Sequence, residues 1–229
     1  MTASGSLPRA VISRVALRAN ARAAVGAGGA VADLRGDAFG HGVLHSARIV
    51  HDAGVERILV DDSSIAATLV AEGIDAVLSA QADISAEALY GLPGAGMVPV
   101  MSLTGRVLSL KPLRAGEAVS YGYTHRAESD TTIALVTGGY AQGIVRALGN
   151  HAAVGVGTKL RPIVGRVAMD VCVVDLQASD AAEDLGTEIV YFGAGAAVAE
   201  LATWTRVTGM RATELVAAAG AKAVREWAD

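Results

Sequence analysis

The feature that most constrains the fold is a strand–helix–strand–helix–strand pattern between residues 30 and 80. Short apolar segments at 30–34, 57–60 and 76–80 indicate buried strands, and residues 42–54 and 63–73 place apolar residues at helical spacing. Strands and helices that alternate in this way form parallel sheets with right-handed crossovers. The first part of the chain is therefore predicted to be an α/β unit of about three parallel strands.

The pattern changes near residue 97, beyond which strand signals dominate. Several segments alternate apolar and polar residues, as half-buried antiparallel strands do, at 107–113, 117–123, 131–139, 162–176 and 187–193. Two helices, at 197–207 and 211–227, are predicted to close a mostly β half. A Gly- and Pro-rich segment at 91–99 suggests a boundary. We expect domains at 1–96 and 97–229, with the first strand free to join the C-terminal domain.

Composition argues against several classes of function. The 229 residues carry a net charge of −4 with no strongly basic segment, which argues against nucleic acid as a partner. No apolar run approaches the ~20 residues that a membrane span requires, and the N-terminus lacks a signal-peptide pattern. Cys172 is the single cysteine, so no disulfide framework is possible. These features predict a cytoplasmic protein with no membrane partner.

No set of metal ligands stands out. His41 lies between two glycines, and no other His, Cys or acidic residue repeats at ligand spacing, so we expect no metal site. A loop histidine bonded to backbone groups is the expected alternative. Cys172 is expected to be a small buried residue of a strand.

Four segments together resemble the alanine racemase family, whose members use pyridoxal phosphate (PLP) to interconvert L- and D-alanine. They are ADLRGDAFGHG at 32–42, LKPLRAGEAVSYGYT at 110–124, GGYAQG at 138–143 and PIVGRVAMDVC at 162–172; ALYGL at 88–92 matches a fifth. The resemblance implies a (β/α)₈ barrel followed by a mostly β domain. Because a barrel takes about 250 residues and only ~100 precede the β domain here, we expect a partial barrel that lacks its middle.

The first of these segments departs from the family at the position that matters most. In the family motif K-x-N-A-Y-G-H-G the lysine forms a Schiff base with PLP, and alignment through GHG places Arg35 there. A Schiff base needs a neutral primary amine, whereas a guanidinium stays protonated. Two roles are then open to Arg35: it could bind an anion, or it could be a solvated cation or part of a structural ion pair. We favour the second. Phe39 replaces the tyrosine that contacts the PLP phosphate and loses its donor.

The C-terminal side keeps more of the pattern. The resemblance gives Tyr121 the place of the second catalytic base and Tyr140 that of a tyrosine at the substrate entrance. Met169, followed by Asp170, falls where a backbone N–H meets the substrate carboxylate. The alternative for each, which we favour, is a role in the fold and the dimer surface. Ile84 falls at the position where the family has an arginine that pairs with the PLP ring nitrogen.

Three hypotheses follow. The leading one is a shortened family member that has lost racemisation, does not bind PLP and has a binding, scaffolding or regulatory role. The second makes the chain a partner of a full-length alanine racemase, because family active sites combine one subunit's barrel with the other's C-terminal domain; this chain would donate Tyr121. The third is that the chain remains an enzyme, either a PLP-dependent alanine racemase that uses Lys111, Lys159 or Lys222, or an enzyme with altered chemistry. We expect a homodimer as the default, because a partial barrel leaves exposed strand edges that a second copy could cover.

Overall fold

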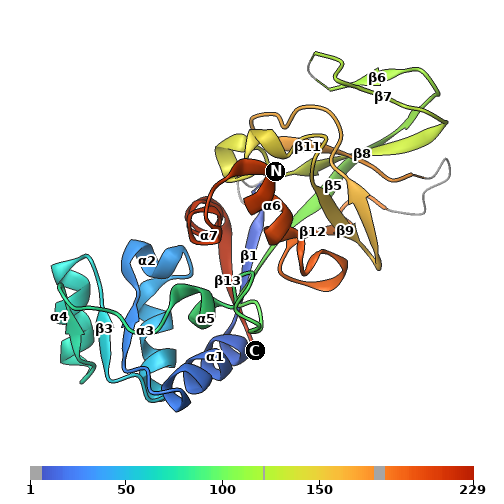
Figure 1. Cartoon of the computed structure of the whole chain (residues 1–229). Helices are drawn as coiled ribbons and strands as arrows, with labels where there is room; N and C mark the ends of the chain where they lie inside the picture. The colour runs from blue at the N-terminus through green and yellow to red at the C-terminus, as the bar shows by residue number, and fades with distance from the viewer. Residues whose placement is uncertain (1–6, 121, 178–183) are drawn as a thin grey trace. The chain divides into compact units, whose positions relative to one another are not determined.

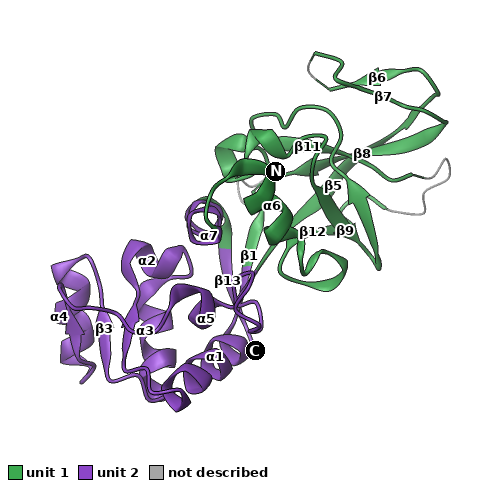
Figure 2. Cartoon of the chain, in the orientation of Figure 1, with its two compact units in different colours: residues 1–10, 102–211, 222–224 green, residues 11–101, 212–221, 225–229 purple. Residues whose placement is uncertain are grey.

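The computed structural model describes residues 7–120, 122–177 and 184–229 (Figure 1). Its contacts divide the chain into two compact units, shown in green and purple in Figure 2. The β unit comprises residues 1–10, 102–211 and 222–224, and the α/β unit comprises residues 11–101, 212–221 and 225–229. Within the described ranges, no helix combines the length and the apolar character needed to cross a membrane.

The α/β unit is built on a three-stranded parallel sheet in the order β2-β3-β4. In its register Ala32 lies opposite Ile58, which lies opposite Ala76. The predicted parallel strands are therefore confirmed, whereas their origin as part of a barrel stays a prediction. The elements are α1 (Arg14–Gly26), β2 (Val31–Asp33), α2 (Arg35–Phe39), α3 (Val43–Asp52), β3 (Arg57–Leu59), α4 (Ser63–Ala71), β4 (Ala76–Val77), α5 (Ala86–Tyr90) and most of α7 (Ala212–Lys222).

Side-chain caps set where two helices of the α/β unit begin. The Ser13 hydroxyl accepts the backbone N–H of Ala16 at 3.1 Å, at the start of α1. The Asp62 carboxylate accepts the backbone N–H groups of Ser64 and Ile65 at 2.7 and 3.2 Å, at the start of α4. Both caps satisfy donors that have no partner inside their helices.

The β unit contains an eight-stranded sheet with the neighbour order β10-β9-β12-β5-β1-β13, in which β8 pairs with both β5 and β11. The pairs β10–β9, β12–β9, β12–β5, β5–β8 and β8–β11 are antiparallel, as expected for a mostly β domain. The strands of this sheet are β1 (Arg9–Ser13), β5 (Met101–Leu113), β8 (Thr131–Thr137), β9 (Ala153–Val156), β10 (Lys159–Pro162), β11 (Val171–Asp175), β12 (Glu188–Phe192) and β13 (Val224–Ala228). Strands β6 (Ala118–Val119) and β7 (His125–Arg126) form a separate antiparallel pair. The helix α6 (Glu200–Thr208) also belongs to this unit, and the unit boundary falls within β1, β5 and β13.

The largest buried side chain of the β unit is Trp204 of α6. Its ring meets those of Tyr191 and Phe192 edge-on, with centroids 6.2 and 5.2 Å apart, and all three side chains are fully buried. The Tyr191 hydroxyl donates to the Thr137 carbonyl at 2.6 Å, which satisfies its polar end inside the core. This aromatic cluster joins α6 to strand β12 and to the end of β8.

Three predicted elements differ from the structure. Of the strand predicted at 117–123, only β6 (Ala118–Val119) is a strand among the described residues. The strand predicted at 162–176 is interrupted, because the chain turns at Gly165 (φ 70°) between β10 and β11. The helix predicted at 211–227 ends at Lys222, and the chain continues as strand β13. Val224 and Trp227 belong to residue types that favour strands, and this preference prevails over the helical pattern there.

Candidate functional site

The backbone that follows β2 is strained. Five consecutive residues, Gly36, Asp37, Ala38, Phe39 and Gly40, have φ values of 61°, 56°, 56°, 50° and 81°, so this segment, labelled α2, is a left-handed turn. For each of the three non-glycine residues this conformation costs roughly 1–2 kcal/mol. Strain of this kind persists only where the surrounding structure holds it, and it concentrates at functional sites.

Asp37 provides part of that support. One carboxylate oxygen accepts the backbone N–H of Val43 at 2.8 Å, where α3 begins, and the other forms an ion pair with Arg225. The backbone N–H of Gly36 donates to the Asp61 carboxylate at 2.9 Å. The turn is therefore tied to α3, to β13 and to the loop after β3.

Helix α7 packs directly against the same turn. A Cβ atom at Gly220 would lie 2.2 Å from the Gly40 carbonyl oxygen, and one at Gly40 would lie 2.9 Å from the Ala217 carbonyl oxygen. Only glycine at both positions allows the two backbones to approach this closely. The N-terminal motif and the C-terminal helix thus form one packed structure inside the α/β unit.

His41 lies beneath the turn and is fully buried. Its Nδ1 lies 2.8 Å from the Ala38 carbonyl oxygen and 3.2 Å from that of Phe39, so it carries the proton and donates. The expected backbone-bonded histidine is therefore found. Burial lowers the pKa of His41 to about 4, although the two carbonyls raise it, and the ring is neutral at pH 7.

Arg35 forms an ion pair with Asp33, the last residue of β2. The carboxylate accepts from three nitrogen atoms of the arginine: the backbone N–H at 3.0 Å, Nε at 3.0 and 3.2 Å to its two oxygens, and Nη2 at 2.6 Å. Partial burial raises the pKa of Asp33, but the bonds from Arg35 outweigh it and the pKa lies below its ordinary value. The same bonds raise the pKa of Arg35. The guanidinium is thus held in a charged pair.

A pocket of about 370 Å³ lies beside this pair, within the α/β unit. It is lined by Asp33, Arg35, Gly36, Phe39, Thr213, Glu214 and Ala217. The charged groups are two carboxylates and one guanidinium, and none of these lining residues is a lysine. The three lysines of the chain, Lys111, Lys159 and Lys222, are exposed and belong to the β unit.

The positions singled out in the C-terminal half lie in the β unit, where three of them come together. The residue after Tyr140 donates its backbone N–H to the Met169 carbonyl at 2.9 Å, and Asp170 follows. Tyr140 and Met169 are 44% and 59% exposed, and the Arg146 guanidinium lies 5.7 Å from the Tyr140 ring centroid. Tyr121 lies outside the described residues. Ile84 is buried and pairs with β2 through Ala32.

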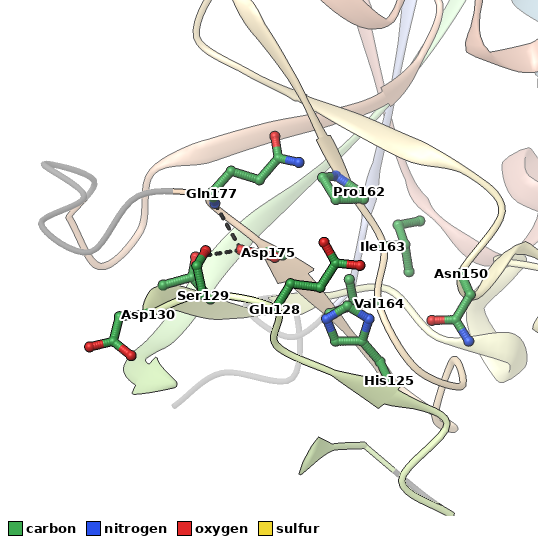
Figure 3. Close-up of a pocket in the computed structure, with 11 residues that line it drawn as sticks. His125, Glu128, Ser129, Asp130, Asn150, Pro162, Ile163, Val164, Asp175 and Gln177 are labelled. Atoms are coloured by element: carbon green, nitrogen blue, oxygen red, sulfur yellow. Dashed lines mark hydrogen bonds between the residues drawn. The ribbon is translucent and has the colours of Figure 1, made fainter. Parts of the chain in front are cut away.

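The β unit also has a pocket of about 450 Å³, shown in Figure 3. It is lined by His125, Glu128, Ser129, Asp130, Thr131, Asn150, Pro162, Ile163, Val164, Asp175 and Gln177. The Asp175 carboxylate accepts from the Thr131 hydroxyl at 2.6 Å and from the Gln177 backbone N–H at 2.8 Å. Among the residues that the structure describes, none of the site residues expected from the sequence lines this pocket. Across the part of the chain that is described, no three His, Cys, Asp or Glu side chains are grouped to hold a metal ion.

Sequence reasoning identified Arg35 but missed its partner. Asp33 stands two positions earlier, and a carboxylate so close in sequence to the arginine was a usable signal for an ion pair, although the strand ends at Asp33. The Asp37–Arg225 pair had no such signal, because the two residues are 188 positions apart. Only the folded chain brings them together.

Comparison with known proteins identifies the family. Residues 100–227, more than half of the chain, match the family model described as the alanine racemase C-terminal domain. This chain belongs to the alanine racemase family. It is 44% identical over 100 residues to the alanine racemase of Mycolicibacterium vanbaalenii, covering 44% of this chain and 26% of that protein. It is 40% identical over 116 residues to the biosynthetic alanine racemase of Salmonella typhimurium, covering 51% of this chain and 32% of that protein.

Solved alanine racemases share the fold of this family member. The enzyme from D-cycloserine-producing Streptomyces lavendulae aligns with a TM-score of 0.82 and 21% identity over 98% of this chain and 97% of that one. The enzyme from Bartonella henselae, solved with covalently bound PLP, gives a TM-score of 0.79 and 16% identity over 97% of this chain and 99% of that one. In sequence, however, the chain spans only about a quarter to a third of the length of the curated racemases it matches.

Proposed function

We propose that this member of the alanine racemase family has lost PLP-dependent racemisation and acts as a binding or regulatory protein. The observation that carries the proposal is the Asp33–Arg35 ion pair at the end of β2. It stands where the motif of the family carries its reactive lysine. A guanidinium with a raised pKa, bonded to a carboxylate, supplies no neutral amine.

The pocket beside Arg35 does not fit covalently held PLP. An aldehyde needs a primary amine, and residues 1–101 contain no lysine. A phosphate group needs cations or N–H and O–H donors. The Phe39 side chain offers none, and the one lining guanidinium is bonded to Asp33, which leaves the Thr213 hydroxyl as the remaining side-chain donor of the lining. The carboxylates of Asp33 and Glu214 would repel a phosphate. These features support loss of the cofactor chemistry.

A racemisation assay tests this proposal. Protein saturated with PLP is incubated with L-alanine, and D-alanine is measured against free PLP at the same concentration. We expect no rate above that of free PLP. An active racemase remains the alternative, since the named relatives are alanine racemases. A rate well above free PLP would establish it, and substituting Lys111, Lys159 and Lys222 in turn would identify the lysine.

A second candidate function is association with a full-length alanine racemase, or with a second copy of this chain, through the β unit. It is favoured by the family match, which falls on residues 100–227, and by the exposure of Tyr140 and Met169. Light scattering after size exclusion, with and without a full-length racemase, tests it. We expect a mass above that of one chain of 23.1 kDa. A single-chain mass in both samples would contradict it.

A further inference from the structure

We propose that Asp33 is a second determinant, separate from Arg35, that keeps PLP chemistry out of this pocket: it would hold any cation at position 35 in its charged form. The inference rests on the proposed function and extends it, because it predicts that replacing the arginine by lysine is not enough. The Asp33 carboxylate would meet the new ammonium group as it now meets the guanidinium.

The placement of the carboxylate does not depend on the arginine side chain. Asp33 ends β2, where it is paired in register with Leu59 of β3. Its Oδ1 accepts the backbone N–H of Arg35 at 3.0 Å, a bond that every residue except proline can donate. The side chain of Asp33 is only 16% exposed, so it has little room to turn toward solvent. A lysine at position 35 would therefore face the same carboxylate in the same orientation.

The charges around position 35 all favour a cation. An opposite charge within ~4–6 Å favours the charged form of a group by about 1–3 pKa units. The Arg35 Nη2 atom lies 2.6 Å from Asp33 Oδ2, and the Asp61 carboxylate adds a second, weaker attraction that also raises the pKa of Arg35. The side chain of Asp33 is largely buried whereas that of Arg35 is 54% exposed, so solvent screens this pair in part, from the side of position 35.

A stabilised ammonium group cannot react with an aldehyde. Its nitrogen must first lose a proton; its lone pair then forms the bond to the aldehyde carbon, and the aldehyde oxygen leaves as water. Each unit by which the carboxylate raises the pKa of the amine reduces the reactive fraction about tenfold at neutral pH. Asp33 therefore acts on the first step, before any bond to a cofactor forms.

Three variants separate Asp33 from Arg35: R35K, D33N/R35K and D75N/R35K. The D33N substitution removes the negative charge, yet its amide oxygen still accepts the backbone N–H at position 35. D75N is the matched control, because Asp75 forms an ion pair with Arg57 at 2.7 Å in the same unit and lines no part of the pocket. Each variant is treated with PLP and borohydride, and peptide mapping measures the adduct at position 35.

We expect at least about a tenfold higher initial rate of adduct formation at position 35 in D33N/R35K than in R35K or D75N/R35K. Equal rates in R35K and D33N/R35K would overturn the role of Asp33 and leave the proposed function standing. A saturable, one-to-one adduct on a single lysine of the wild-type chain would instead contradict the proposed function. The two failures are therefore distinguishable.

A second measurement does not depend on binding of PLP. The lysines of R35K and D33N/R35K are reductively methylated with ¹³C, and the NMR signal assigned to position 35 is titrated with pH. We expect the pKa at this position to fall by at least about one unit when Asp33 is replaced. An unchanged pKa would overturn the inference, including in the case where none of the variants reacts with PLP.

Discussion

The imidazole of His41 stacks on the phenol ring of Tyr90, with ring centroids 4.3 Å apart and planes 22° from parallel. Both side chains are fully buried, and the Tyr90 hydroxyl lies 3.4 Å from the Asp33 carbonyl oxygen. Two segments that resemble the family, 32–42 and 88–92, thus meet through packing. The contact gives both segments a role in the fold of the α/β unit that requires no catalysis.

The buried histidine makes stability depend on pH. The pKa of His41 is about 4 in the folded chain, against 6.5 for a free histidine, so the unfolded chain binds more protons between these values. The free energy of unfolding should fall as the pH falls from 6.5 toward 4, by up to about 3 kcal/mol. Urea unfolding across this range measures the slope. His41→Phe keeps a stacking ring and should lose this dependence of the unfolding free energy on pH. The control His51→Gln, at an exposed histidine, should retain it. Equal slopes of unfolding free energy against pH in the two variants would contradict the account.

Asp37 should contribute more to the stability of the fold through the hydrogen bond it accepts than through its charge. Asp37→Ala removes the acceptor for the Val43 N–H and places alanine at φ 56°, so we expect a loss of about 1–3 kcal/mol of stability. Asp37→Asn keeps an acceptor and loses only the exposed ion pair with Arg225, which is worth less than about 1 kcal/mol. Urea unfolding at neutral pH compares the two. Equal losses would show that the charge, and not the acceptor, holds the turn.

The strand order of the α/β unit could be predicted because its signals are local. Strands β2, β3 and β4 are short apolar runs separated by helices of regular period, and this pattern fixes both pairing and direction. Helix α1 was missed. Arg14, Arg18 and Arg22 recur at helical spacing and form its polar face, but the opposite face gives little apolar signal. Its buried residues are mostly small or polar, Ala16, Asn20 and Ala21 beside Leu17.

The candidate site could be predicted only in part, for a similar reason. The missing amine at Arg35 is visible at a single position of the sequence. The left-handed turn is not, because Ala38 and Phe39 rarely adopt positive φ and nothing local requires it. The turn is held by α7 and by Arg225, which lie far along the chain. Sequence reasoning therefore identified the changed chemistry and missed the scaffold around it.

The contact between α7 and the turn can be tested with two helical glycines. Gly220→Ala places a methyl group within 2.2 Å of the Gly40 carbonyl oxygen, so we expect it to lower stability by about 1–3 kcal/mol despite the better helix propensity of alanine. Gly26→Ala, at the end of α1, meets no atom within 4 Å and should be neutral or slightly stabilising. Thermal unfolding compares them. Equal stability of the two variants would mean that α7 does not pack on the turn.

The single cysteine should be unreactive in the folded protein. Burial raises the pKa of Cys172 to about 12, and its thiol donates to the Gly138 carbonyl at 2.9 Å. We expect no labelling by iodoacetamide in native buffer and complete labelling in concentrated guanidinium chloride. Leu160→Cys, at a position that is 44% exposed, should label at once under native conditions. Rapid labelling of native Cys172 would contradict its placement in the core.

The most direct test of the central claim is the reaction of the wild-type chain with PLP. The protein is titrated with PLP while its absorbance is recorded, then reduced with borohydride and weighed intact by mass spectrometry. Because Arg35 is bonded to Asp33 and the pocket contains no lysine, we expect no saturable Schiff-base band and no stoichiometric adduct, only the weak labelling that the exposed Lys111, Lys159 and Lys222 give at high PLP. A band together with one PLP group fixed on a single lysine would contradict the account and would name the residue that carries the chemistry.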